Sequence, residues 1–434
     1  MIDFSTQVKT KLFSIISDME KHRSEYVQNP NKDFVRSRKL SFSAMMKILI
    51  SMGGSTLQKE LYNFFDFDTA TPTSSAFIQQ RSKLLPSAFK FLMRELNHSF
   101  TTTKEFRGYR LLAVDGSDAH TPTYPDDKES YIHSNENGRG FNLIHVNTLY
   151  DLLSKRYEDV VIQKYRLKNE NKALCEMIDC SEITDKVILL ADRYYESYNN
   201  MAHAQSKGWN YLFRIKDTRG IMRAVTVPDK DEFDIELNLL FTRVRSKKTT
   251  GNPDKYKVIP SAMKFDYLQK HSKDCFPMYF RIVRVKLSDS LYETLVTNLK
   301  KDDFSSEDLK KLYSMRWGVE TAFRELKYNI GLNNFHSKKP EFVLQEILAR
   351  LIMYNVSMII SINVCISQEQ KTYVYQINFS VAIHICVNFI RHNRSSPKSV
   401  EDLIKQNILP VRPGRSSRRL MKKGKPSVSF IYRV

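Results

Sequence analysis

The stretch from residue 107 to residue 217 constrains the fold most, because it alternates strand-like and helix-like segments. Three successive strands, apolar and β-branched with turns between them, are predicted for GYRLLAVDG, FNLIHVNTLY and YEDVVIQKYRL. Two further strands and two helices are predicted for KVILLADR, WNYLFRIKD, KALCEMIDC and ESYNNMAHAQSKG. KVILLADR is a continuous apolar run, which is typical of a strand buried on both faces. The order of these segments predicts an α/β fold with a mixed sheet.

The flanking regions have other patterns, and they divide the chain. Apolar residues recur at helical spacing before residue 105, from 305 to 331, and near 341–366 and 377–392. Between residues 218 and 303 the segments are strand-like, with no clear helix. We therefore predict a helical domain, a split α/β core, an all-β insertion, and a C-terminal helical region with a basic tail. Their respective bounds are 1–105, 106–217 with 304–335, 218–303, and 336–434.

The chain is strongly basic. It has 68 Lys and Arg against 48 Asp and Glu among 434 residues, a formal net charge of +20, and this excess indicates a polyanionic partner. A membrane surface is disfavoured, because no basic amphipathic anchor is present. Arg36, Arg38 and Lys39 lie close together before a predicted helix, where a solvated turn and a DNA contact are equally open. The tail from Arg412 onward has eight basic residues and no acidic one, so DNA contact is a reasonable expectation there too.

Two further patterns exclude other classes of protein. The most apolar stretch, Ile347 to Ile366, is interrupted by Arg350, Asn355 and Asn363, so we interpret it as a buried helix rather than a membrane span. The five cysteines are scattered, and none forms a CxxC pair. Their spacing therefore indicates neither a zinc site nor a disulfide framework, which fits a reducing compartment.

Two aspartates stand at the ends of predicted strands. Asp115 ends the first strand, in AVDGSD, and Asp192 ends the buried strand, in LLADRYYESYN. A carboxylate at such a position is costly unless it binds a metal or finds hydrogen-bond donors, and strand ends are where open α/β sheets bind ligands. An Asp after a strand is also a common helix cap or turn former. Asp118 is the second choice for the role of Asp115.

The predicted helix KLYSMRWGVETAFRELKYNI carries a polar stripe beside an apolar face. At about 100° per residue, a stripe roughly 80° wide contains Tyr313, Arg316, Glu320, Arg324 and Lys327. Ion pairs four residues apart would explain the alternation of Arg316, Glu320 and Arg324. They would not explain Tyr313, Lys327 or the presence of Gly318. A carboxylate among three cations and a phenol is therefore a candidate site.

These motifs together resemble a known family. The spacing Tyr313-x2-Arg316-x3-Glu320-x6-Lys327 is similar to the signature of cut-and-paste transposases of the insertion-sequence-4 family. AVDGSD and DRYYESYN resemble that family's first and second motifs, and a β-rich insertion separates the second from the third. The resemblance covers about residues 30 to 390. One departure is Tyr194, where the family often has Gly, so the turn after Asp192 is expected to differ in detail.

The resemblance implies a ribonuclease-H-like core in which Asp115, Asp192 and Glu320 are the catalytic, metal-binding carboxylates. Asp115 would bridge two Mg²⁺ ions, with Mn²⁺ as a substitute. Two divalent ions can activate an oxygen nucleophile and relieve charge on a leaving oxygen, and hard Mg²⁺ suits carboxylate ligands. DNA phosphates would be held by side chains on the stripe: Arg316, Lys327, Tyr313 and, outside the signature, Arg324.

The resemblance also implies partners and a place of action. The N-terminal helical region would bind the terminal inverted repeats of an insertion sequence, partly through Arg36, Arg38 and Lys39. Double-stranded transposon ends and target DNA are the expected substrates, and a homodimer on DNA is the expected assembly. No membrane partner is expected. The expected location is the bacterial cytoplasm, in association with the nucleoid.

Some alternatives stay open. A nuclease on the same fold without strand transfer would use the same residues, and an inactive DNA-binding regulator would keep the fold, although it would not need three metal-binding carboxylates. Some family members hold a flipped base with a Trp in the β insertion, but Trp209 and Trp317 lie outside it. We expect Trp317 to be a packing residue and His336 to be structural. The remaining candidates for holding a base are Tyr267, Phe276 and Tyr279.

Overall fold

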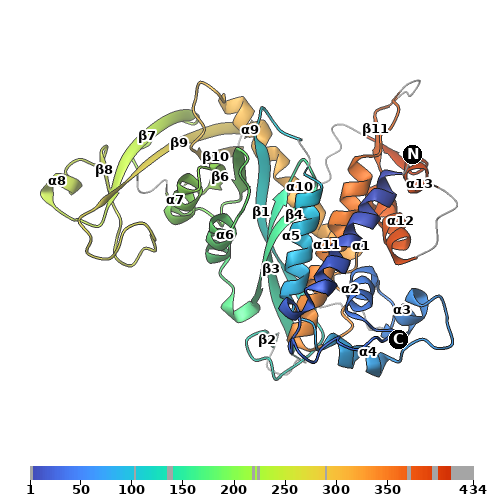
Figure 1. Ribbon diagram of the computed structural model, residues 1–434. Coiled ribbons are helices and arrows are strands. Elements are labelled where there is room, and N and C mark those ends of the chain that lie inside the picture. Colours follow the sequence, from blue (N-terminus) through green and yellow to red (C-terminus); the bar gives the residue numbers. More distant parts are fainter. Residues whose placement is uncertain are drawn as a thin grey trace.

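The computed structural model describes residues 3–101, 104–133, 140–217, 220–221, 225–288, 291–368, 373–392 and 399–411. The basic tail expected from Arg412 onward lies outside the described residues. Within the described part, a large mixed sheet runs through the molecule, with helices on both of its faces (Figure 1). The α/β fold with a mixed sheet is therefore confirmed.

Ten strands form the main sheet, in the order β2-β3-β1-β5-β6-β10-β9-β7-β8, with β4 paired to β3. The pairs β1–β5 and β5–β6 are parallel, whereas β1–β3, β3–β4 and β6–β10 are antiparallel. The strands are β1 (Arg110–Thr121), β2 (Tyr131–Ile132), β3 (Phe141–Asp151), β4 (Arg156–Lys164), β5 (Val187–Ala191), β6 (Asn210–Ile215), β7 (Phe233–Thr242), β8 (Tyr256–Val258), β9 (Cys275–Ser288) and β10 (Leu291–Thr297). A separate two-stranded sheet joins β11 (Tyr375–Ile377) to β12 (Ile408–Pro410).

Helices cover both faces of this sheet, and those of the N-terminal region lie to the right of it in Figure 1. They are α1 (Phe4–Lys21), α2 (Phe42–Ser51), α3 (Leu57–Phe64), α4 (Ser74–Arg81), α5 (Ser87–Ser99), α6 (Glu170–Asp179), α7 (Tyr198–Ser206), α8 (Lys247–Thr250), α9 (Ser306–Met315), α10 (Trp317–Tyr328), α11 (Pro340–Ile362), α12 (Phe379–Arg391) and α13 (Val400–Lys405). Two short 3₁₀ turns occupy Arg23–Glu25 and Tyr165–Leu167. The helices expected near 341–366 and 377–392 are α11 and α12.

Strand β1 shows how the sheet separates two cores. Successive side chains of a strand point to opposite faces, and Leu111 and Ala113 pack into a core shared with α10 and α11. Leu112 and Val114 pack instead into a second core, with α6 and α7. Because β1 and β5 are buried on both faces, their runs are continuously apolar rather than alternating. Odd-numbered residues of β1 consequently face α10, and even-numbered residues face α6.

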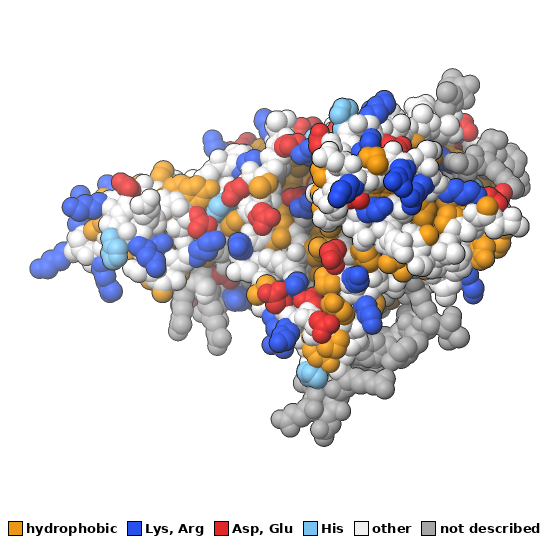
Figure 2. Space-filling view, turned by 60° about the horizontal axis from the view of Figure 1, so that its bottom comes forward, with side chains coloured by type: hydrophobic (Ala, Val, Ile, Leu, Met, Phe, Trp, Pro, Cys, Tyr) orange, Lys and Arg blue, Asp and Glu red, His pale blue; other side chains and the backbone are white. Residues whose placement is uncertain are grey.

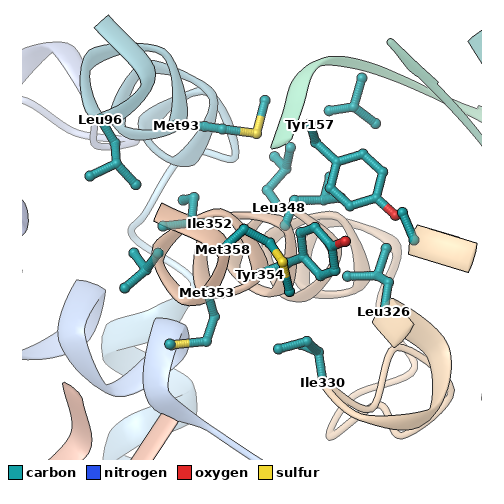
Figure 3. Close-up of a cluster of buried hydrophobic side chains, with 14 of the residues drawn as sticks. Met93, Leu96, Tyr157, Leu326, Ile330, Leu348, Ile352, Met353, Tyr354 and Met358 are labelled. Carbon is teal, nitrogen blue, oxygen red and sulfur yellow. The ribbon is translucent and has the colours of Figure 1, made fainter. Parts of the chain in front are cut away.

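Helix α11 is the centre of the larger core. Figure 3 shows side chains of α5, β4 and α10 gathered around it, among them Met93, Tyr157 and Leu326. It is long and apolar enough to cross a membrane, but 94% of its most apolar 18-residue stretch is buried in the protein. Its polar residues have partners there: Asn355 exchanges hydrogen bonds with the backbone of Tyr157 at 2.9 and 2.8 Å. The expectation of a buried helix is confirmed.

The region expected to be all-β joins the main sheet. Strand β10 pairs with β6, and β9 and β7 follow, so these strands extend the same sheet away from α5 and α11 (Figure 1). One short helix, α8, begins after Ser246, whose hydroxyl caps it through a hydrogen bond from Thr249 N. The domain bounds expected from the sequence stay a prediction.

Candidate active site

Asp115 and Asp192 lie on neighbouring parallel strands. The β1–β5 register pairs Ala113 with Leu190, and two residues further along each strand stand Asp115 and Asp192. Because side chains alternate between the two faces along each strand, both carboxylates face α10. Asp192 directly follows β5, where its Oδ1 accepts a hydrogen bond from Tyr194 N at 2.9 Å. Asp115 lies in the middle of β1, which continues to Thr121 along β3, so the prediction that Asp115 ends its strand is wrong. The two aspartates are neighbours because the parallel pairing of β1 with β5 ends just before both of them.

Glu320 reaches the same point from α10, which packs on β1. The expected single helix is divided into α9 and α10, which meet at Arg316 with helical dihedral angles. Helix α9 begins with a capping box in which Ser305 and Asp308 bond each other's backbone. Gly318 lets α10 approach the sheet closely, since a Cβ there would stand 2.9 Å from Leu152 Cδ2. The glycine that ion pairing could not explain lies at this contact.

The pKa of Asp115 reflects the other two carboxylates. Burial is the main cause that raises the pKa of Asp115 to about 7, and the charges of Asp192 and Glu320 raise it further. A hydrogen bond from Gly116 N at 2.9 Å and the charge of Arg316 act in the opposite direction. Asp115 is thus a half-buried carboxylate whose burial and negative neighbours outweigh the donors available to it. Such a group is stabilised by an added cation.

The cations and the phenol of the stripe take different positions. The Arg316 side chain is buried, and its Nη2 donates to Glu320 Oε1 at 3.0 Å. Tyr313 is buried beneath it, which raises the pKa of its phenol to about 12. Lys327 Nζ donates to Ser117 Oγ at 2.6 Å and to the Asp118 carbonyl at 2.9 Å. Arg324 is exposed, and its charge acts on Glu325.

Asp118, the second choice for the role of Asp115, points to the other face of the sheet. It stands opposite His145 in the β1–β3 register, and the His145 Nδ1 lies 2.5 Å from its Oδ1. His145 Nε2 lies 3.0 Å from Glu170 Oε1 at the start of α6. Burial alone would lower the pKa of His145, but the two carboxylates raise it to about 9. Asp118 therefore belongs to an ion triad beside the site, in which His145 is buried and Asp118 is partly exposed.

This triad was not found from the sequence, and it has a direct effect on β1. A Cβ at Gly116 would overlap His145 Nε2 and would stand 3.3 Å from Asn147 Oδ1. Gly116 is therefore the residue that lets β1 and the histidine pass each other, one position after Asp115. The glycine in AVDGSD was the available signal, because a glycine inside a strand marks a close approach.

The aromatic residues considered from the sequence have different surroundings. Tyr267 and Phe276 pack on each other with ring centroids 4.8 Å apart, and the Tyr279 hydroxyl donates to Glu236 at 2.7 Å. Trp317 is 47% exposed, with the Arg316 guanidinium 5.0 Å from its ring centroid, so the expectation of a packing residue is wrong. Tyr194 is 58% exposed without a positive φ, so the turn after Asp192 does not require glycine.

A basic pocket adjoins the carboxylates and was also missed. Its lining includes Arg193, directly after Asp192, together with Arg214 and Lys216 of β6 and Tyr292 of β10. The charge of Arg214 also lowers the pKa of Tyr313, so the pocket lies close to α9. These cations are scattered along the sequence, so spacing offered no signal for them.

Other residues chosen from the sequence lie elsewhere. Arg36, Arg38 and Lys39 are exposed in the segment before α2, and Lys39 pairs with Asp68 at 2.9 Å. His336 is buried with its Nδ1 3.2 Å from Glu346 Oε2 and its Nε2 3.1 Å from the Ser55 carbonyl, which confirms a structural position. The structure thus brings together Asp115, Asp192, Glu320, Arg316, Tyr313 and Lys327, and leaves the three N-terminal cations outside this group.

Comparison with known protein families decides the family. The model of the transposase DDE domain matches residues 106–356, more than half of the chain. The chain is a member of the DDE transposase family. The match begins just before β1 and ends within α11, so it contains Asp115, Asp192 and Glu320.

Two transposases of insertion sequences and one solved structure were compared with this chain individually. Transposase InsG for insertion sequence element IS4 of Escherichia coli is 23% identical over 287 residues, which are 65% of this chain and 60% of that protein. The putative transposase InsL for insertion sequence element IS186A of Escherichia coli is 36% identical over 58 residues, 13% of this chain and 16% of that one. A piggyBac transposase synaptic complex with hairpin DNA aligns with 97% of this chain and 88% of its own, at 11% identity and a TM-score of 0.45.

Proposed function

We propose that this DDE transposase binds the terminal inverted repeats of an insertion sequence and catalyses cut-and-paste cleavage and strand transfer. The observation that supports it most is the convergence of Asp115, Asp192 and Glu320 on the face of the sheet that α10 covers, beside buried Arg316. The core would be ribonuclease-H-like, which the antiparallel β4-β3-β1 strands followed by parallel β5 and β6 support. The domain bounds given above would be those of this core and its surroundings.

The carboxylates fit divalent metal ions. Their donors are all hard oxygens, which suits Mg²⁺, with Mn²⁺ as a substitute. The pKa of Asp115, raised to about 7 by burial and by its acidic neighbours, indicates negative charge in excess of the nearby donors. Asp115, Asp192 and Glu320 would hold two ions, which when bound supply an activated oxygen nucleophile and relieve charge on the leaving oxygen.

The neighbouring side chains would position DNA. Arg316 and Lys327 carry fixed positive charge on either side of Glu320, so they would hold backbone phosphates next to the scissile bond. Tyr313 has a phenol that burial keeps protonated, and it would donate to a phosphate oxygen. Arg324 is exposed on the next turn and would contact DNA further from the reacting atoms.

Charge outside the site supports a DNA partner. The segment 245–273, here the basic tip, carries exposed cations around α8 and β8: Arg245, Lys247, Lys248, Lys255, Lys264, Lys270 and Lys273. Figure 2 shows Lys and Arg side chains spread over this elongated end of the molecule. Arg36, Arg38 and Lys39 would add contacts from the N-terminal helices, and a homodimer would assemble on two DNA ends. Action on DNA in the bacterial cytoplasm, at the nucleoid, follows from these substrates.

The test is cleavage of a linear DNA that carries the ends of the element with its flanks, in Mg²⁺ and in Mn²⁺. We expect metal-dependent cuts at the element boundary, lost in Glu320→Gln while DNA binding survives. Glu325→Gln is the matched control. Glu325 lies on the same helix, but it accepts a hydrogen bond from the Tyr354 hydroxyl and is not part of the carboxylate site. Binding without cleavage by the wild type in both metals would contradict the proposal and favour a regulator.

A second assay separates transposase from nuclease. Pre-cleaved element ends with free 3′-hydroxyls are mixed with a circular target plasmid. A transposase joins them to the plasmid, whereas a nuclease that cannot transfer strands leaves both unjoined. Failure to join by a protein that still cuts would establish the nuclease instead.

A further inference from the structure

Three side chains with metal-binding chemistry meet on the face of the sheet opposite the carboxylates. They are Cys175 of α6, His203 of α7 and Asp266 in the loop after β8, and one ligand atom of each lies within 4.8 Å of the others. Cys175 and His203 are buried, whereas Asp266 is 41% exposed. The three residues are remote from one another in the sequence, so no spacing motif indicates this cluster.

The histidine is oriented as a metal ligand would be. His203 Nδ1 lies 2.8 Å from Asp179 Oδ1, and Nε2 lies 3.0 Å from Asp266 Oδ2. Metal-bound histidines commonly donate from the far ring nitrogen to a carboxylate, which fixes the ring and raises its basicity. Asp179 is placed to do this, while Nε2 faces Asp266.

Two asparagines hold the other two groups. Asn199 Nδ2 donates to Asp266 Oδ2 at 2.8 Å and to Cys175 Sγ at 3.5 Å. Asn200 Oδ1 lies 3.4 Å from the same sulfur. The loop itself is fixed to α7, because Asp266 N donates to Asn199 Oδ1 at 2.7 Å. Sulfur, nitrogen and oxygen donors are thus held together by a shell of hydrogen bonds.

We propose that Cys175, His203 and Asp266 form a binding site for one Zn²⁺ ion, which ties the loop after β8 to helices α6 and α7. A thiolate and an imidazole select a borderline-soft ion such as Zn²⁺ over Mg²⁺, which prefers oxygen ligands. The exposed side of Asp266 leaves a fourth position open to water. This inference does not depend on the proposed function.

Without Zn²⁺, the three residues are held by hydrogen bonds and ion pairs, which a bound ion would replace. The hydrogen bond with Cys175 is the main cause that raises the pKa of His203 to about 9, with contributions from Asp179 and Asp266 that outweigh burial. Lys264 Nζ also lies 3.2 Å from Asp266 Oδ2. A bound ion would take the place of these hydrogen bonds and displace the lysine.

The decisive probe is Co²⁺, titrated into the full-length protein after chelation and removal of metals. We expect one equivalent to produce a thiolate-to-Co²⁺ charge-transfer absorption, which Zn²⁺ abolishes and excess Mg²⁺ does not. The carboxylate site cannot produce this band because it lacks sulfur. Cys175→Ser should lose the band, whereas Cys180→Ser, at the exposed end of the same helix, should keep it.

A second measurement covers the case in which Cys175→Ser fails to fold. Asp266→Ala changes a half-exposed side chain, and it should weaken Co²⁺ binding at least tenfold while the protein stays folded by circular dichroism. Zn²⁺ should raise the melting temperature of the wild type and have a smaller effect on Asp266→Ala. Absence of the charge-transfer band in the wild type overturns the proposal, as does a band that Cys180→Ser removes or Asp266→Ala leaves unchanged.

Discussion

At the scale of single residues, Gly116 shows how a buried histidine constrains the candidate site. Its position leaves no room for a Cβ, because His145 is held between Asp118 and Glu170 and cannot swing away. Any shift of β1 at Gly116 also moves Asp115, one residue before it. The histidine thus acts on the site through the backbone.

We expect Gly116→Ala to lower the free energy of unfolding by about 2 kcal/mol, in the range for overpacking a core, and to reduce DNA cleavage at least tenfold. Urea unfolding and a cleavage assay would measure the two effects. The double variant with His145→Ala removes the ring that the added methyl group would meet. If its loss of stability equals the sum of the two single losses, the steric account is wrong.

Lys327 and Arg324 form a natural pair of variants on α10. Lys327 donates to Ser117 and to the Asp118 carbonyl, whereas Arg324 is exposed. Loss of one charged hydrogen bond in the reaction costs about 2 kcal/mol, or roughly thirtyfold in rate. We expect Lys327→Met to slow cleavage by about that factor and Arg324→Met by much less. Equal effects would remove the distinction between the two cations.

At the scale of elements, α11 connects the N-terminal helices to the segment that follows α10. Its Glu346 is buried in an ion cluster with Arg81 of α4, His336 and Arg350. Burial alone would raise the pKa of Glu346, but the charge of Arg81, the hydrogen bond with His336 and the charge of Arg350 outweigh burial and lower this pKa to about 2. One carboxylate thereby holds three segments that are remote in sequence.

This cluster predicts a dependence of stability on pH. Because the folded-state pKa lies below the unfolded value of 4.5, the contribution of Glu346 is complete above pH 4.5 and is lost as the pH falls toward 2. Glu346→Gln should lower the free energy of unfolding at pH 7 by about 3 kcal/mol, because it leaves buried cations unpaired. The variant should also unfold with a smaller dependence on pH in that window. An unchanged dependence in urea titrations would exclude Glu346 as the source.

At the scale of the whole molecule, positive charge is spread over an elongated body, and the basic tip lies far along the sheet from the N-terminal helices (Figure 1). Each phosphate that a protein neutralises releases counterions, which makes DNA affinity depend on salt. The distribution of cations therefore predicts which part of the molecule adds to the footprint on DNA.

We expect the combined replacement of Lys247, Lys248 and Lys255 by Gln to weaken binding to element ends and to reduce the slope of log affinity against log salt. The reduction should be up to about 0.9 for each DNA phosphate that the variant no longer neutralises. A matched variant replaces Lys11, Lys21 and Lys405, which are exposed outside the tip. A slope for the tip variant equal to that of the wild type, measured by fluorescence anisotropy, would show that the tip does not bind DNA.

Local patterns in the sequence determined much of the architecture. The strands from GYRLLAVDG to WNYLFRIKD, the helices α11 and α12 and the burial of α11 follow from hydrophobic periodicity over ten or twenty residues. The polar stripe across α9 and α10 follows from fixed helical spacing, and with the two aspartate motifs it indicated the family. Periodicity did not show that α9 and α10 meet at Arg316 or that Trp317 is half exposed, because both depend on how the helices pack.

Only the tertiary structure decided which distant residues meet. It placed Asp115 and Asp118, three residues apart, on opposite faces of β1, and it paired Asp118 with His145. It joined β10 to β6, and it brought Cys175, His203 and Asp266 to one point although their spacing indicated nothing. The physical reason is that periodicity and capping act between neighbours along the chain. Contacts between remote residues depend instead on strand order, register and the packing of helices on each face of the sheet.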